Sequence, residues 1–289
     1  MPGETVGRSG SEATEVLSAL ALQLAWGADE ALADAPQDRF RPLKARGPLT
    51  TPPSSRHVAD ASAGPSVPPA AQPIAAPLAG PVAEAERLAA SADTLEALRE
   101  LFARFEGCAL RETATNFVFA DGSPAAPVML VGEGPGAEED REGLPFVGPS
   151  GRLLDRMLAS IGLSRHDGTI YITNVLPWRP PGNRSPTDGE IAVCLPFLRR
   201  HIALAQPKIL LLAGGVPARA LLGAREGITR LRGRWRLLDI PPLAEPIPTL
   251  PTLHPAYLLR NPGAKREAWA DLILLRRRLD TLLPQVGRN

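Results

Sequence analysis

Four short, mainly apolar runs, separated by segments with helical periodicity, constrain the fold of this 289-residue chain more than any other feature. The runs lie at 128–131, 170–173, 209–212 and 249–253. Runs of this length are typical of strands that are buried on both faces. Because strands that alternate with helices favour a parallel sheet, the sequence predicts a three-layer α/β/α domain around a central, mainly parallel, four-stranded sheet.

Helical patterns fill the segments between these runs. Asp93 and Glu96 have the three-residue spacing of a capping box, and Thr187 and Glu190 have the same spacing. Apolar residues at helical spacing follow both pairs. The expected helices cover about 93–107, 149–161, 187–202, 218–222 and 266–283.

The first 92 residues differ in composition from the rest. Residues 47–82 contain nine prolines and eight alanines. Such a segment cannot bury enough apolar surface to offset its chain entropy. We therefore expect a helical arm over 1–46, a disordered Pro/Ala-rich linker over 47–92 and a globular domain over 93–289. The arm carries leucines at helical spacing, and docking on the domain and binding of a separate protein partner both stay open.

Composition excludes several classes of protein. No stretch reaches the ~20 apolar residues of a membrane span, and the start lacks a signal-peptide pattern, so cytoplasmic residence is expected. Two cysteines are too few for a disulfide scaffold, and the four histidines lie too far apart for a zinc finger. The net charge is −5 over 1–100 and +6 over 101–289. A basic part suits a polyanionic partner, but an ordinary solvated surface explains it equally well.

Polar residues follow three of the four predicted strands. Glu133 comes just after the first, Asn174 ends the second and His254 follows the fourth, while glycines follow the third. Open α/β sheets bind ligands beyond the carboxyl ends of their strands. We therefore expect a carboxylate, an amide and an imidazole to converge at one edge of the sheet.

The glycines of the first loop also fit a dinucleotide fingerprint. Gly132, Gly134 and Ala137 match G-x-G-x-x-A. However, Pro135 interrupts the loop, and the acidic stretch that follows would repel a pyrophosphate. The sequence therefore disfavours a dinucleotide site.

Three motifs, read together and in order, narrow the function. They are GEGPGAEEDREGLPFVG at 132–148, ITN followed by RPPGNRSPT at 172–187, and HPAYLLR at 254–260. This set resembles the family 4 uracil-DNA glycosylases of the uracil-DNA glycosylase superfamily, over about residues 95–280. The resemblance implies a monofunctional hydrolase of DNA repair. Such an enzyme binds DNA, flips out deoxyuridine and hydrolyses its N-glycosidic bond, leaving an abasic site for base excision repair. It also implies a monomer whose partner is uracil-containing DNA.

The resemblance implies a catalytic role for each strand-end side chain. Glu133 would position the attacking water or balance the positive sugar, Asn174 would read the pyrimidine edge, and His254 would donate to uracil O2. Each side chain alone also has a structural interpretation, as a turn cap, a turn former or a loop residue. Their joint occurrence favours the catalytic interpretation.

Further residues are assigned to binding by the same resemblance. Phe146 would stack on the flipped uracil, although an aromatic residue in this setting also suits simple packing. Backbone N–H groups around Gly134, Gly136 and Ala137 would help to hold the base. DNA contacts are implied for the phosphate-binding residues Arg184, Arg232 and Arg260, and for a duplex wedge formed by Leu258 and Leu259.

One part of the family pattern is broken. The family usually carries a 4Fe–4S cluster on four cysteines, and the corresponding positions here are Phe105, Cys108, Trp178 and Cys194. Two thiolates would leave irons of a cluster without ligands. We therefore predict that no cofactor or metal is bound, that the two aromatic residues fill the cluster volume, and that Cys108 and Cys194 lie close together and reduced.

Two other functions stay open. One is a non-catalytic DNA or damaged-base binding module on the same fold, which would not need Glu133 or His254. The other is an enzyme that acts on free nucleosides or nucleotides. DNA binding should weaken steeply as salt rises, because counterions are released, whereas nucleoside binding should not.

Overall fold

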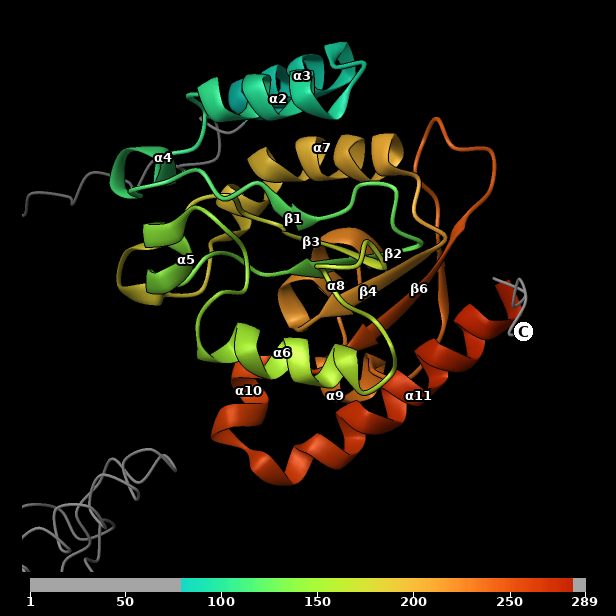
Figure 1. Cartoon of the computed structure of the whole chain (residues 1–289). Coiled ribbons are helices and arrows are strands. Elements are labelled where there is room, and N and C mark those ends of the chain that lie inside the picture. Colours follow the sequence, from blue (N-terminus) through green and yellow to red (C-terminus); the bar gives the residue numbers. More distant parts are fainter. Residues whose placement is uncertain (1–78, 283–289) are drawn as a thin grey trace, which may run out of the picture. The chain divides into compact units, whose positions relative to one another are not determined.

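Residues 79–282 are described by the computed structural model, and they form a sheet covered on both faces by helices (Figure 1). The strand order is β1-β3-β2-β4-β6-β5. The strands are β1 (Ala120–Gly122), β2 (Val128–Gly132), β3 (Ile170–Asn174), β4 (Ile209–Ala213), β5 (Arg236–Leu238) and β6 (Ile247–Thr252). The four predicted strands are confirmed as β2, β3, β4 and β6, which run parallel. The antiparallel edge strands β1 and β5 were not predicted.

Helices form the two outer layers. On one face lie α2 (Ala79–Ser91), α3 (Leu95–Arg104), α7 (Asp188–Ala205) and α8 (Gly215–Leu222), and on the other lie α6 (Pro149–Ala159) and α11 (Lys265–Leu282). Four shorter helices lie in connections: α4 (Leu110–Thr113), α5 (Ala137–Glu142), α9 (Ile228–Leu231) and α10 (Pro255–Arg260). Within 79–282, no helix is both long and apolar enough to cross a membrane.

The core follows the alternation of side chains along each strand. In β2, Met129 and Val131 pack in the layer of α7, whereas Val128 and Leu130 pack in the layer of α6 and α11. Every residue of β2, β3 and β4 is buried. This two-sided burial explains why the strands read as continuous apolar runs rather than as alternating ones.

Helix α2 lies inside the predicted linker. Residues 79–91 form a helix in which Ala85 and Ala89 are buried, and α2 packs against α7. The linker prediction therefore extended too far towards the C-terminus. Alanine is the best helix former and needs little room at a close helix–helix contact, so the composition that suggested an unfolded segment also suits this packing. The rest of the linker and the arm at 1–46 lie outside the described residues.

Helix ends were predicted with mixed success. The capping box of Thr187 and Glu190 is confirmed, since the Glu190 carboxylate accepts from the Thr187 N–H at 2.7 Å and the Thr187 hydroxyl accepts from the Glu190 N–H at 3.2 Å. The predicted cap at Asp93 is wrong by one residue. Thr94 is the N-cap of α3, and its hydroxyl accepts from the N–H of Ala97 at 3.1 Å.

Candidate active site

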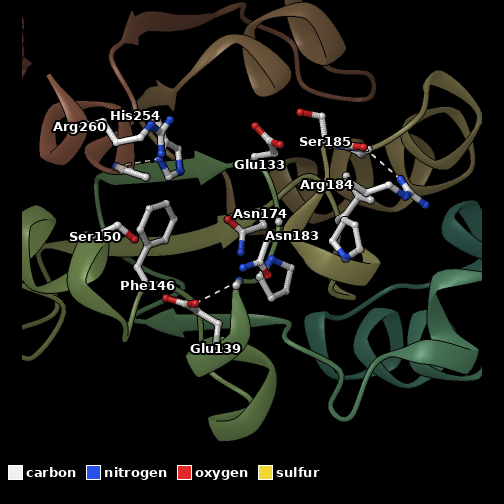
Figure 2. Close-up of a pocket in the computed structure, with 17 residues that line it drawn as sticks. Glu133, Glu139, Phe146, Ser150, Asn174, Asn183, Arg184, Ser185, His254 and Arg260 are labelled. Atoms are coloured by element: carbon white, nitrogen blue, oxygen red, sulfur yellow. Dashed lines mark hydrogen bonds between the residues drawn. The ribbon is translucent and has the colours of Figure 1, made fainter. Parts of the chain in front are cut away.

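A pocket of about 410 Å³ opens where β2 and β3 end and α10 begins. Its lining brings together Glu133, Phe146, Asn174 and His254, which come from four separate segments (Figure 2). This volume is within the usual range of small-molecule sites. The structure thus places the predicted carboxylate, amide and imidazole around one cavity.

Asn174 is the last residue of β3, and this buried residue lines the pocket. Among the residues that the structure describes, its Oδ1 atom has no hydrogen-bond partner. A Cβ atom at Gly132 would lie only 2.3 Å from that oxygen, so a side chain at position 132 would displace the Asn174 amide. A buried acceptor without a partner typically destabilises a protein by about 1–3 kcal/mol. A ligand that presents an N–H to Oδ1 would remove this penalty.

His254 is the N-cap of α10, and its ring is held in one tautomer. The Nδ1 atom accepts a hydrogen bond from the N–H of Ala256 at 3.1 Å. Burial, helped by the positive charge of Arg260, lowers the pKa of His254 to about 4. The ring is therefore neutral near pH 7, and its proton resides on Nε2. This geometry supplies a neutral hydrogen-bond donor.

Phe146 is a buried side wall of the pocket and adopts an unusual backbone conformation. Its φ is 55°, in the left-handed region that side chains rarely occupy. Its ring lies 5.5 Å from the ring of His254, centroid to centroid, with an angle of 29° between the planes. Gly151 permits this arrangement, because a Cβ atom there would lie 1.8 Å from the carbonyl oxygen of Phe146.

Glu139 fixes the loop around Phe146, a role that the sequence interpretation missed. Its Oε1 atom accepts from the N–H groups of Val147 at 3.0 Å and Gly148 at 2.9 Å, and its Oε2 atom accepts from Gly136 at 3.1 Å. The signal was present, because Glu139 stands at the third position of a helix that begins after Gly136. The sequence interpretation treated it only as a charge that repels phosphate.

Glu133 follows β2 directly and supplies one of the two carboxylates that line the pocket, the other being that of Glu139. Burial raises the pKa of Glu133, while Arg219 and Arg260 lower it to a smaller extent. A partly desolvated carboxylate of this kind can accept a proton from a water molecule or balance a positive charge. The proximity of Arg219 was not expected from the sequence.

The glycine loop is only partly available to a ligand. Gly134 and Gly136 line the pocket, but Ala137 is exposed and lies outside the lining. The N–H of Gly136 already donates to Glu139. The backbone donors predicted around this loop are therefore fewer than expected.

The five predicted DNA-contacting residues divide into two groups. Arg184 and Arg260 line the pocket, and Leu259 is exposed on α10. Arg232 instead donates to the buried carboxylate of Asp271 at 2.9 Å, and it lies outside the lining. Leu258 is completely buried. Leu258 is therefore not available as a duplex wedge in this structure, contrary to the sequence-based assignment, whereas Arg232 is engaged with Asp271 and its DNA contact stays a prediction.

Three further polar residues line the pocket without having been predicted: Ser150, Asn183 and Ser185. Asn183 is held by Arg179, whose Nε donates to its Oδ1 atom at 2.7 Å, so the amide nitrogen remains available to a ligand. Arg184 forms two hydrogen bonds with Glu190, at 2.9 and 2.6 Å. Glu190 thus links the capping box of α7 to the pocket wall.

The positions that correspond to cluster ligands do not fit an iron–sulfur cluster. Cys108 and Cys194 are buried and free, and they lie close together as predicted. Their hydrogen bond lowers the pKa of Cys108, and it raises the pKa of Cys194, as does burial. Within 79–282, no group of three or more potential metal ligands exists.

Aromatic side chains belong to the same core cluster as these two thiols. Phe102 stacks on Phe197 at 4.1 Å between centroids and meets Trp178 edge-on at 5.3 Å, while Phe105 lies 5.2 Å from Phe197. Phe105 and Trp178 are both buried. Such rings supply packing but no thiolate, so the donor set falls short of the four that a 4Fe–4S cluster requires.

Comparisons with known proteins show the family to which the chain belongs. The model of the uracil DNA glycosylase superfamily matches residues 119–273. A type-4 uracil-DNA glycosylase of Sulfurisphaera tokodaii is 38% identical over 182 residues, which cover 60% of this chain and 80% of that protein. Type-4 enzymes of Archaeoglobus fulgidus and Pyrobaculum aerophilum are 37% and 36% identical, and the matches cover 57% and 62% of this chain and 82% and 92% of those proteins. The chain therefore belongs to the uracil-DNA glycosylase superfamily, together with its type-4 members.

Proposed function

We propose that this protein is a uracil-DNA glycosylase that hydrolyses the N-glycosidic bond of deoxyuridine in DNA and leaves an abasic site. One observation carries the proposal: Asn174 lines a pocket together with Phe146 and His254, and among residues 79–282 its buried Oδ1 atom has no hydrogen-bond partner. The type-4 uracil-DNA glycosylases to which the chain is similar support the same activity.

The amide of Asn174 matches the edge of uracil. Its Oδ1 atom would accept from uracil N3–H, and its Nδ2 atom would donate to uracil O4. Cytosine presents the reverse pattern, with an acceptor at N3 and a donor at N4, so the same amide would face cytosine with unpaired groups. Phe146 offers an aromatic face on which a flipped base can stack. The pocket thus distinguishes the two bases by hydrogen bonding.

The reaction breaks the bond between N1 of uracil and C1′ of the sugar. The electron pair leaves with N1, and the resulting negative charge spreads to O2, where the Nε2–H of His254 stabilises it by a hydrogen bond. A water oxygen then bonds to C1′, and the Glu133 carboxylate takes up the proton that this water loses. The uracil anion then takes up a proton from solvent and Glu133 releases its proton to solvent, so the products are uracil and an abasic deoxyribose with a hydroxyl at C1′.

The substrate strand is held outside the pocket. Arg184 and Arg260 lie at the pocket, where they would contact phosphates beside the flipped nucleotide. Leu259, which is 41% exposed, would fill the space that the base leaves in the duplex. Extrusion of a base requires a few kcal/mol, and these contacts supply part of that energy.

The test is excision from a labelled oligonucleotide with one uracil, measured in single turnover for the wild type and two asparagine variants. We expect cleavage at uracil after alkali, a loss of about 10²-fold or more in Asn174→Ala, and wild-type rates in Asn261→Ala, an exposed asparagine outside the pocket. A folded wild type that binds uracil-containing DNA but releases no uracil would favour the non-catalytic binding module instead.

We also propose that the protein folds and acts without an iron–sulfur cluster. The aromatic packing around Cys108 and Cys194 supports this, since only two thiols are present. We expect purified protein from iron-replete cells to lack acid-labile sulfide and visible absorption. The double variant Phe105→Cys with Trp178→Cys provides the comparison, because it restores four thiols. Stoichiometric iron and sulfide in active wild type would contradict the proposal.

Three further parts of the proposal concern the setting of the enzyme. A monomer is expected, and light scattering would measure its mass. Cytoplasmic residence is expected, and cell fractionation would test it.

The arm at 1–46 is proposed to bind a separate protein. Equal recovery of partners by the full chain and by a variant lacking residues 1–78 would contradict that last point.

A further inference from the structure

We propose that Arg165 is a positioning residue for uracil excision, because it fixes the backbone that carries Phe146 into the pocket. This inference rests on the proposed function. Arg165 lies between α6 and β3 and does not line the pocket. It acts through the carbonyl oxygens of two residues in the wall, Pro145 and Phe146.

All five N–H groups of the Arg165 guanidinium have partners. Its NH1 nitrogen donates to the Pro145 carbonyl at 2.9 Å and to Asp121 at 2.8 Å. The NH2 nitrogen donates to the Phe146 carbonyl at 3.0 Å and to Asp155 at 2.8 Å, and Nε also donates to Asp155, at 3.0 Å. A guanidinium has five such donors in a rigid plane, whereas the single nitrogen of lysine has three. The geometry therefore requires arginine.

The backbone conformation of Phe146 explains why the hydrogen bonds of Arg165 are needed. A φ of 55° is unfavourable for a residue with a side chain, typically by about 1–3 kcal/mol, and persists only where the surroundings impose it. Here Arg165 holds the carbonyl oxygens at 145 and 146, while Glu139 holds the N–H groups at 147 and 148. Two buried charged side chains thus fix the backbone around Phe146: Arg165 binds residues 145 and 146, and Glu139 binds the two residues that follow.

A purely structural role for Arg165 predicts a different outcome. Its two carboxylate partners connect α6 with β1, and it also binds two buried carbonyl oxygens, so its loss will lower stability. However, the side chains of Asp155 and Asp121 are 45% and 28% exposed, and water can solvate them when the guanidinium is gone. The domain should therefore still fold without Arg165. A structural role alone would leave the rate of the folded enzyme unchanged.

The first experiment compares Arg165→Met, Arg165→Lys and Arg200→Met in the full chain, below their melting temperatures. Arg200 is the matched control, because it donates two hydrogen bonds to one backbone carbonyl, that of Ala92, outside the pocket lining. We expect both Arg165 variants to lose about 10²-fold in the single-turnover rate with an unchanged KM for DNA, and the control to keep both. Wild-type rates in either Arg165 variant would overturn the proposal.

The second experiment asks whether Arg165 acts through Phe146. In a Phe146→Ala background, Arg165→Met should cause little further loss, because the ring that it positions is already absent. Two independent losses that multiply would overturn the proposal. Gly151→Ala tests the position of Phe146 without changing Arg165, since the added Cβ would push on the Phe146 carbonyl. This variant should lose about as much rate as the Arg165 variants. A wild type without any uracil excision would refute the proposed function itself, which separates the two failures.

Discussion

Leu258 and Leu259 are neighbours in the sequence and in α10, but one is buried and the other is exposed. The side chain of Leu258 is 0% exposed and packs with Leu153, Leu253 and Ala268, whereas that of Leu259 is 41% exposed. The HPAYLLR motif therefore contains one core residue and one surface residue, and only the second is free to enter a DNA duplex.

This difference predicts separate effects of two similar substitutions. Leu258→Ala should lower the free energy of unfolding by about 2–5 kcal/mol, because it removes a fully buried side chain from an apolar cluster. Leu259→Ala should leave stability unchanged and slow excision from duplex DNA more than from single strands, because a wedge matters only where a base leaves a stack. Urea unfolding and parallel excision assays on the two substrates would measure these effects. Equal slowing on both substrates would contradict the wedge role.

Because its Nε2 carries the proton, His254 is expected to contribute to the rate of the chemical step as a hydrogen-bond donor. His254→Ala should lower the single-turnover rate by about 10²–10³-fold, as expected when a preorganised donor to a developing anion is removed. The dissociation constant for uracil-containing DNA should change little. His166→Ala is a suitable control, since His166 is exposed and outside the pocket. A loss confined to DNA binding would show that His254 is not the leaving-group donor.

The pKa shifts in the pocket predict an unusual pH profile. Burial raises the pKa of Glu133 above its ordinary value of 4.5, and burial lowers that of His254 to about 4. If Glu133 acts as a carboxylate, the rate should fall as pH decreases through the raised pKa of Glu133. His254 is already neutral well below its ordinary pKa, so no inflection near 6.5 should occur. Rates of wild type and Glu133→Gln from pH 4 to 8 would test this. The acid limb should disappear in the low residual activity of the variant.

Substitution of Arg232 should affect stability, whereas substitution of Arg260 should affect DNA binding. Arg232→Met leaves the buried Asp271 without its cation, which should lower stability by about 3–5 kcal/mol and leave the salt dependence of DNA binding unchanged. Arg260→Met should leave stability unchanged and reduce the slope of log K against log salt by about 1. Binding isotherms at several salt concentrations and thermal melts would separate the two. An unchanged slope in Arg260→Met would remove this residue from the DNA interface.

The four parallel strands could be predicted from the sequence, because a strand that is buried on both faces appears as a continuous apolar run. It did not reveal β1 or β5, which have three residues each and only one buried side chain between them. Helix α2 was missed for a related reason, because its buried face consists of alanines, which also occur in unfolded segments. Short or alanine-lined elements depend on tertiary contacts that no local pattern reports.

The same reasoning separates the predicted and the unpredicted parts of the pocket. Glu133, Asn174 and His254 were predictable because each lies where a strand ends, so topology alone brings them together. Arg165 was not, because its hydrogen bonds reach back 19 and 20 residues to the Phe146 loop and 44 to β1. The burial of Leu258 was also hidden, since a helix of six residues is too short to show which face is apolar.

The unpartnered oxygen of Asn174 has one consequence for turnover. Free uracil carries the same N3–H and O4 as uracil attached to DNA, so the released base satisfies the amide as well as the substrate does. The excised base should therefore rebind to the emptied pocket and compete with the next damaged strand. Under the role proposed for Asn174, the amide that recognises the base in DNA would thus also hold the product and slow turnover.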